Sequence, residues 1–473
     1  MTKLFCSLAV CTLIFACQSP KNRPSVNGVW QSLGSGWVVH IQDSTQYMLY
    51  DRTTSTCFPN RSAELSEILP ALQMVSDTLR WKKGAITYYF TRTSEVPAPC
   101  QQVLSDAQKK DPIYNFEVFA ETVQENYAFM ELNHLSWEAL YTEQKAKLLA
   151  NPTNTTLYTV LEETQERLND NHAYLEADDQ TYAALEALIV QEEMDVAQSD
   201  VPEIGDFQIA QQVARHHLKK EMTQDSWLLH WGALENAIGY IQIKSMWLHA
   251  DLEISPRLIE SEGFVGAYVQ TFQNMYEGDY IDKEVAGIRK TMQRVMADLS
   301  DMDAIVLDVR FNGGGQDAVS FEILRWFNDE KRPIVHQKLK YGSGFSPTTI
   351  LELDGMENAF TRPIYILTSP QTGSAAEAFT IATLSLPHAK RIGAATSGAL
   401  STALEKQLPN GWSFALSNEI YMDLEDRLFE NTGVPVDFRL AYPRERQLFF
   451  RSVAQNLEKD KADILNAIRS FTN

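Results

Sequence analysis

The sequence predicts an α/β protein of several domains, a multidomain α+β arrangement, because its hydrophobic pattern changes twice along the chain. Short apolar runs separated by turn residues come first, and helical spacing follows from about residue 111. From Ile238 onward, apolar strands alternate with helices, which is typical of a buried sheet covered by helices. With 473 residues, the chain is long enough to bury more than one hydrophobic core.

The first 17 residues have the features of an export signal. Lys3 precedes an apolar run, Leu4 to Ala16, that is too short to span a bilayer. The run ends in Ile14-Phe15-Ala16-Cys17, which resembles the lipobox of bacterial lipoproteins. We therefore expect a lipoprotein signal peptide over 1–17, a linker over 18–25 and a lipid anchor at Cys17. This places the chain in the bacterial cell envelope, facing the periplasm or the exterior, with a plain signal peptide as the alternative.

The positions of the cysteines agree with the predicted location in the cell envelope. Cys57 and Cys100 are the two cysteines that follow the anchor position. In an oxidising compartment such a pair favours a disulfide, which would close a loop of about 43 residues and stabilise the fold by about 3 to 4 kcal/mol. Two free buried thiols are the alternative.

Charge and motif content exclude several classes of function. The chain carries 62 acidic and 41 basic side chains, a formal net charge of -21, which repels nucleic-acid backbones. We therefore expect no nucleic-acid partner. The motifs C-x-x-C and H-E-x-x-H are absent, so no metal site is expected. No cofactor is expected either, because the glycine spacings of phosphate and dinucleotide loops are missing.

Two regions precede the alternating part of the chain. Apolar runs with turn residues between them predict a small, largely antiparallel β module over 26–105. Helical spacing of apolar residues predicts a helical domain over 111–235, which contains the polar turn Asn169-Asp170-Asn171-His172.

The remaining residues, 236–473, are predicted to form an α/β core. Strands are expected at 239–243, 304–309 and 364–367, and helices near 283–299, 318–327 and 375–384. If the sheet is parallel, the segments after its strands meet at one edge, where sites in such folds usually lie.

A glycine run follows the second of these strands, in Asp308-Val309-Arg310-Phe311-Asn312-Gly313-Gly314-Gly315. Consecutive glycines let backbone N–H groups turn toward a ligand in conformations that side chains would forbid. The run therefore fits a loop that binds developing negative charge. A tight strand-to-helix turn is the alternative interpretation.

A serine follows the third strand, in Thr372-Gly373-Ser374-Ala375-Ala376-Glu377. It stands at the start of a helix rich in small residues, where free N–H groups favour negative charge. By itself this is the pattern of an N-cap serine. Together with the glycine loop on a neighbouring strand, it becomes a candidate nucleophile.

These segments resemble the C-terminal-processing and tricorn-type serine peptidases, over roughly residues 111–437. Residues 304–315 are similar to the D-x-R-x-N-x-G-G segment of that family, 372–377 to its nucleophile motif, and 391–398 to its following strand and turn. The resemblance implies a ClpP/crotonase-like α/β catalytic core and peptidase activity. It implies Ser374 as nucleophile, with Gly313, Gly314 and Ala375 supplying the oxyanion hole.

The base distinguishes branches of the family. In the tail-specific branch a lysine follows the glycine of the last turn, but here Ala399 follows Gly398. Lys390 and Lys406 do not occupy the motif position. The resemblance therefore does not extend to a Ser–Lys dyad.

The tricorn-type branch uses a histidine from the helical region and a distant glutamate. Asp170-Asn171-His172 is similar to that histidine motif, and Glu430 opens a segment that resembles the glutamate-bearing turn. The resemblance implies His172 as the base, with Glu430 and Asn171 orienting polar partners. A group that titrates near neutrality suits this work, because a serine hydroxyl attacks only after losing its proton.

The sequence between His172 and Tyr240 has no convincing PDZ pattern, so recognition of C-terminal tails is not expected. We expect an endo- or oligopeptidase that acts on peptides or unfolded chains. The alternative is a non-catalytic lipoprotein that binds ligands or peptides on the same fold, since fold alone does not fix function.

Overall fold

The computed structural model describes residues 25–192, 202–273 and 275–472. The predicted signal peptide and Cys17 lie outside the described residues. Within the described ranges, every helix is too short or too polar to cross a membrane.

A seven-stranded antiparallel sheet forms the N-terminal module, as predicted, with the strand order β4-β3-β2-β1-β7-β6-β5. Alternating burial along its strands puts one face of the sheet into a hydrophobic core. The strands are β1 (Gly28–Ser32), β2 (Trp37–Ile41), β3 (Gln46–Arg52), β4 (Cys57–Glu64), β5 (Leu72–Val75), β6 (Thr78–Lys83) and β7 (Ile86–Thr93).

A disulfide joins Cys57 at the start of β4 to Cys100 beyond β7, which confirms the predicted pair. Both cysteines are buried against Val29 and Val38 of the module. The bond therefore ties the segment that leads into the helical layer back to the sheet.

The module shares its core with the rest of the molecule. Trp30 and Trp81 of the module lie in the same hydrophobic cluster as Phe119 and Phe414, which come from the two later regions. A buried ion pair between Lys406 and Asp51, with 2.5 Å between Nζ and Oδ1, adds a polar link. The module is thus packed against the hairpin that contains Lys406.

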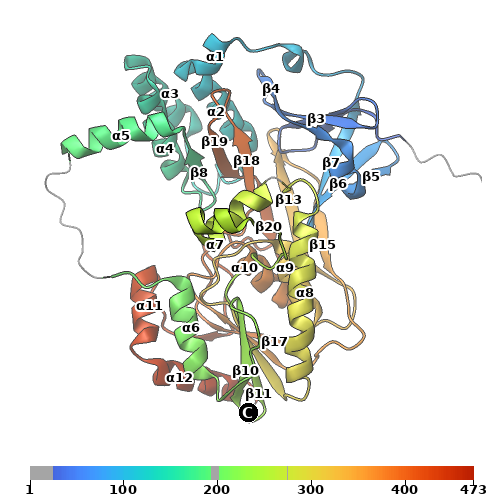
Figure 1. The fold of residues 1–473 in the computed structure, drawn as a ribbon, viewed down its shortest axis with the longest axis vertical. Helices are drawn as coiled ribbons and strands as arrows, with labels where there is room; N and C mark the ends of the chain where they lie inside the picture. The colour runs from blue at the N-terminus through green and yellow to red at the C-terminus, as the bar shows by residue number, and fades with distance from the viewer. Residues whose placement is uncertain (1–24, 193–201, 274, 473) are drawn as a thin grey trace, which may run out of the picture.

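The helical layer occupies the upper left of Figure 1. Its helices are α1 (Asp106–Lys110), α2 (Pro112–Asn126), α3 (Trp137–Ala150), α4 (Asn154–Leu168) and α5 (Asp179–Glu192). Helix α4 ends at Asn169, whose φ of 54° is the left-handed conformation that often closes a helix. The chain turns there into the segment that contains His172.

A mixed seven-stranded sheet forms the lower half of the molecule, in the order β21-β17-β16-β12-β11-β10-β9 (Figure 1). The strands are β9 (Lys220–Glu221), β10 (Leu229–Glu235), β11 (Ile238–Ile243), β12 (Ala304–Asp308), β16 (Ile364–Thr368), β17 (Ala389–Gly393) and β21 (Phe438–Arg439). Strands β12 and β16 are parallel neighbours, so the two segments that follow them meet at one edge. The boundary expected at 235/236 falls between two paired strands, because β10 pairs with β11.

Helices cover both faces of this sheet. They are α6 (Asp206–His217), α7 (Pro256–Gln273), α8 (Tyr280–Leu299), α9 (Asp317–Arg325), α10 (Ala375–Ala382), α11 (Arg446–Ala454) and α12 (Leu457–Ser470). Among the predicted helices, those near 283–299, 318–327 and 375–384 correspond to α8, α9 and α10.

Two smaller sheets connect the halves. One contains β13 (Arg332–Tyr341), β14 (Gly344–Phe345), β15 (Thr349–Leu353) and β20 (Glu419–Met422), and the other β8 (Tyr174–Glu176), β18 (Ala403–Gln407) and β19 (Ser413–Ser417). Strand β8 comes two residues after His172 and pairs with β19, so the helical layer is joined to the core beside that histidine.

Candidate active site

Ser374 lies between strand β16 and helix α10 in a backbone conformation unusual for serine. Its φ is 51° and its ψ is -125°, which costs about 1 to 3 kcal/mol in a non-glycine residue. Ser369 and Thr372 hold the preceding turn, because their hydroxyls donate to the carbonyls of Arg310 and Val309 at 2.6 and 2.9 Å. The serine turn is therefore fastened to the end of the neighbouring strand, β12.

His172 reaches Ser374 across 202 positions of sequence. Its Nε2 lies 3.0 Å from Ser374 Oγ, which is hydrogen-bonding distance. Burial lowers the pKa of His172 below its usual 6.5, and the Asp170 carboxylate partly opposes this shift. The imidazole is therefore neutral at pH 7 and available to accept a proton.

The Asp170 carboxylate fixes the loop that contains His172. It accepts hydrogen bonds from the Ser417 backbone N–H and hydroxyl, both at 2.6 Å, and from the His172 backbone N–H at 2.9 Å. Since Ser417 ends β19, these bonds anchor the histidine loop to the core. The other ring nitrogen of His172, Nδ1, is buried and has no protein partner among the described residues.

The glycine loop lies directly against the serine. A Cβ at Gly314 would come within 2.6 Å of Ser374 Cβ and 3.0 Å of the Ala375 nitrogen, closer than atoms pack. Gly314 also has a φ of +119°, a conformation that other residues rarely adopt. Glycine is thus required here both for space and for backbone conformation.

One part of the predicted oxyanion hole is wrong in this conformation. Gly314 donates its N–H to Asn312 Oδ1 at 2.9 Å, so it is not a free donor. The backbone N–H groups of Gly313 and Ala375, by contrast, have no protein acceptor in the described part of the chain. Two of the three predicted donors therefore remain free of a protein acceptor among the described residues.

Glu430 and Asn171 contact the turn after β17, at Gly398 to Leu400, and neither side chain bonds to His172 or Ser374. Glu430 Oε2 accepts the Leu400 N–H at 2.9 Å, and Asn171 Nδ2 lies 3.5 Å from the Gly398 carbonyl oxygen. Burial raises the pKa of Glu430 to about 8, against the effect of that backbone bond.

The two lysines considered from the sequence are held elsewhere. Lys406 pairs with Asp51 of the β module, and Lys390 lies 3.9 Å from Asp437. Ala399, at the position of the family's lysine, is buried beside the serine turn and accepts the Ser374 N–H at 3.1 Å. The described residues therefore bring a histidine, and not one of these lysines, to Ser374.

Glu377 is the main residue of the site that sequence reasoning assigned no role. It is fully buried, and its carboxylate accepts bonds from the Ser374 N–H and from the turn after β17. The S-x-x-E spacing of a capping box was visible in the sequence and would have flagged it. Its contacts with a second turn were not visible.

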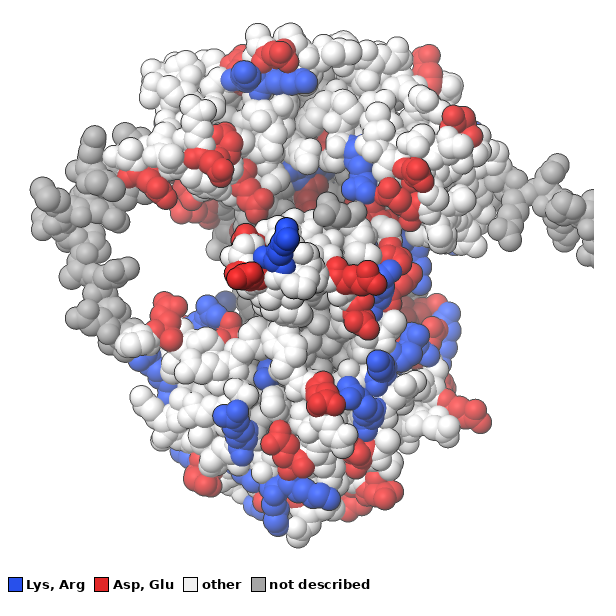
Figure 2. Space-filling view, viewed as in Figure 1, with Lys and Arg blue, Asp and Glu red and all other residues white. Residues whose placement is uncertain are grey.

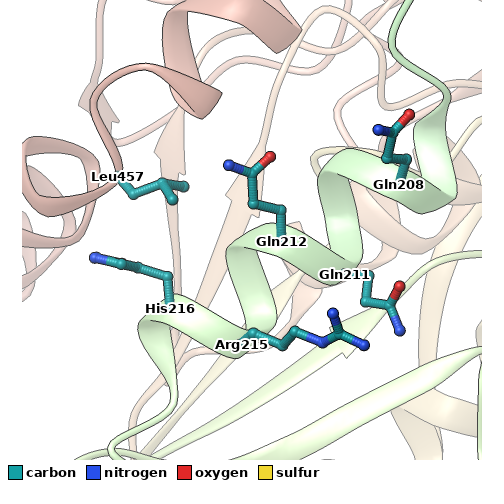
Figure 3. Close-up of a pocket in the computed structure, with 6 residues that line it drawn as sticks. All are labelled: Gln208, Gln211, Gln212, Arg215, His216 and Leu457. Carbon is teal, nitrogen blue, oxygen red and sulfur yellow. The ribbon is translucent and has the colours of Figure 1, made fainter.

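Other polar features lie outside this group. A recess of about 480 Å³ opens on α6, lined by Gln208, Gln211, Gln212, Arg215, His216 and Leu457 (Figure 3). None of the predicted site residues lines it, and His216 Nε2 is bonded to Glu458 at 2.9 Å.

On the face shown in Figure 2, acidic and basic side chains are mixed over both halves of the molecule. Among the described residues, no group of three or more His, Cys, Asp or Glu side chains is arranged to hold a metal ion.

A serine hydroxyl, a neutral histidine and two N–H groups without an acceptor among the described residues lie together at the carboxyl edge of an α/β sheet, and these are the kinds of group that serine hydrolases use. Comparison with known proteins gives the same class. Residues 237–440 match the model of Peptidase family S41. The matched residues make up less than half of the chain, and the match supports a serine peptidase related to the C-terminal-processing and tricorn-type enzymes.

Solved structures match the fold. A protein described as a candidate peptidase from Parabacteroides merdae ATCC 43184 aligns with a TM-score of 0.51 and 18% identity, covering 73% of this chain and 96% of that chain. Mature CPAF aligns with a TM-score of 0.52 and 12% identity, covering 77% of this chain and 99% of that chain. At these identities the likeness shows the fold alone.

Proposed function

We propose that this chain hydrolyses peptide bonds through an acyl-enzyme, with Ser374 as nucleophile and His172 as general base. The observation that carries the proposal is the 3.0 Å contact between His172 Nε2 and Ser374 Oγ. A hydroxyl and a neutral imidazole at this distance form the pair that serine hydrolases use.

The reaction then follows from the geometry. His172 Nε2 accepts the Ser374 proton as Oγ bonds to the scissile carbonyl carbon. The N–H groups of Gly313 and Ala375 stabilise the resulting oxyanion, each worth about 3 to 4 kcal/mol in comparable sites. His172 gives its proton to the departing amine. In the second half of the reaction, His172 accepts a proton from water as the water oxygen attacks the ester, and then returns the proton to Ser374 Oγ as the ester bond breaks. Asn171 and Glu430 support this geometry through the turn at Gly398 to Leu400.

Wild-type protein is expected to cleave an unfolded polypeptide such as reduced casein, whereas Ser374→Ala protein is not. New amino termini, counted by mass spectrometry, measure the cleavage. Equal cleavage by both proteins would contradict the proposal, and identical unfolding curves would confirm that the variant is folded.

We also propose that the chain is exported and anchored by lipid at Cys17. The signal-like residues 1–17 support this, and the Cys57–Cys100 disulfide is typical of oxidising compartments. Cells that express the full chain should incorporate radiolabelled palmitate into the wild type and not into Cys17→Ala. Equal incorporation in both would overturn the anchor.

A further inference from the structure

We infer that Glu377 is a positioning residue for Ser374, and that its carboxylate must be ionised to hold the serine and the adjoining turn in the reactive arrangement. This inference rests on the proposed role of Ser374 and deepens it. Glu377 itself contacts no reacting atom.

The contacts of Glu377 reach two separate segments. On one side, Oε2 accepts the Ser374 N–H at 3.2 Å. On the other, Oε2 accepts the Ala399 N–H at 2.7 Å, and Oε1 accepts the Gly398 N–H at 2.7 Å and the Thr396 hydroxyl at 2.6 Å. One carboxylate therefore joins the nucleophile to the turn that follows β17.

That turn is in direct contact with the nucleophile. The Ser374 N–H also lies 3.1 Å from the Ala399 carbonyl oxygen, and the Ser397 N–H donates to the Thr372 carbonyl oxygen at 2.9 Å. A shift of the turn would therefore move the strained backbone at Ser374. Displacements of about 1 Å in such sites lower rates by about a hundredfold.

The donors around Glu377 select the ionised form. Both oxygens receive N–H or O–H groups, and each N–H can only donate. A proton on Oε2, or the NH₂ group of glutamine at that position, would point at the Ser374 and Ala399 N–H groups, which can only donate. Protonation thus breaks bonds that the carboxylate makes.

Glu377 is protonated in an accessible pH range. Burial raises its pKa to about 7, although the Thr396 hydroxyl and the backbone N–H groups of the turn oppose the shift. Glu430 interacts with it electrostatically, and His172 lies on the other side of Ser374. Since the pKa of His172 lies below 6.5, activity should fall first with the protonation of Glu377 as the pH decreases.

The test is the rate of Ser374 labelling by a fluorophosphonate probe from pH 5 to 9. In this reaction Oγ bonds to phosphorus, fluoride leaves and His172 takes the proton. Wild type should lose reactivity with a midpoint near 7. Glu377→Gln should label about ten- to a hundredfold more slowly at its plateau, with the midpoint moved to the lower pKa of His172.

Two further variants separate the groups involved. Thr396→Val removes one donor to the carboxylate without changing the side chain's size much, so its midpoint should move above that of wild type. Glu419→Gln is the matched control, because Glu419 is also buried with a pKa of about 7 but bonds to Tyr88 and Gln337. Its midpoint should stay that of wild type.

Three outcomes would overturn the inference: an unchanged midpoint in both Glu377→Gln and Thr396→Val, a wild-type midpoint below 6.5, or a shift that appears only in Glu430→Gln. If Glu377→Gln does not fold, an unchanged midpoint in Thr396→Val alone, or a wild-type midpoint below 6.5, overturns the inference. Absence of labelling in wild type at every pH would instead contradict the proposed function itself.

Discussion

Replacing His172 with alanine should lower kcat/KM for peptide hydrolysis by about four to six orders of magnitude, because the group that removes the Ser374 proton is lost. The Ser374 hydroxyl then has to ionise without a base, at a pKa far above neutrality. The His172 side chain is only half-buried, so the loss of stability should be small beside the loss of rate. The measurement is steady-state cleavage of a fluorogenic peptide.

His336→Ala is the matched control for this prediction. His336 is also half-buried and bonded through a ring nitrogen, to Asp426 at 2.8 Å, but it lies on β13 and not beside Ser374. Its kcat/KM should remain within about twofold of wild type, as for other surface ion pairs. A His172→Ala protein that keeps a tenth or more of the activity would contradict the role of His172.

Gly314→Ala should lower kcat by about two to four orders of magnitude with a smaller change in KM, because the new methyl group has no room beside Ser374. The Cβ would lie 2.6 Å from Ser374 Cβ and 2.9 Å from the Gly373 carbonyl oxygen. The positive φ of Gly314 is also a backbone conformation that alanine rarely adopts. The loop has to move, which takes the Gly313 N–H away from the oxyanion. Pre-steady-state acylation kinetics measure this step directly.

Gly342→Ala separates backbone strain from steric displacement. Gly342 also has a positive φ, of +59°, but a Cβ there meets nothing within 4 Å. This variant should lose about 1 kcal/mol of stability and keep its kcat. If Gly314→Ala were as active as Gly342→Ala, the close approach of the loop to the nucleophile would have no catalytic importance.

The sequence predicted those parts of the site that depend on local pattern. Ser374 and the loop at Gly314 each follow an apolar strand and precede a helix, and parallel neighbours β12 and β16 bring them together. His172 was predicted through its resemblance to a family motif, because nothing local distinguishes it from a turn residue. The contact with Ser374 arises from the pairing of β8 with β19, which no periodicity reveals.

The parts that sequence reasoning missed depend on side chains that bond across several turns. The Asn312 side-chain oxygen accepts the Gly314 N–H. The run of glycines did not indicate this bond. The target of Glu377 is a turn about twenty positions later, and its burial follows from the packing of α10. Glu430 was expected to orient polar partners in the site, and one partner, the Leu400 N–H, is a backbone group that the sequence did not single out.

The central claim is that His172 activates Ser374 for covalent chemistry. Its most direct measurement is intact-protein mass spectrometry after reaction with a fluorophosphonate, followed by peptide mapping of the adduct. We predict a single adduct on the peptide that contains Ser374 in wild type, none in Ser374→Ala and a rate lowered by at least a thousandfold in His172→Ala, which is about 4 kcal/mol. An adduct on another residue, or equal labelling rates in wild type and His172→Ala, would contradict the account.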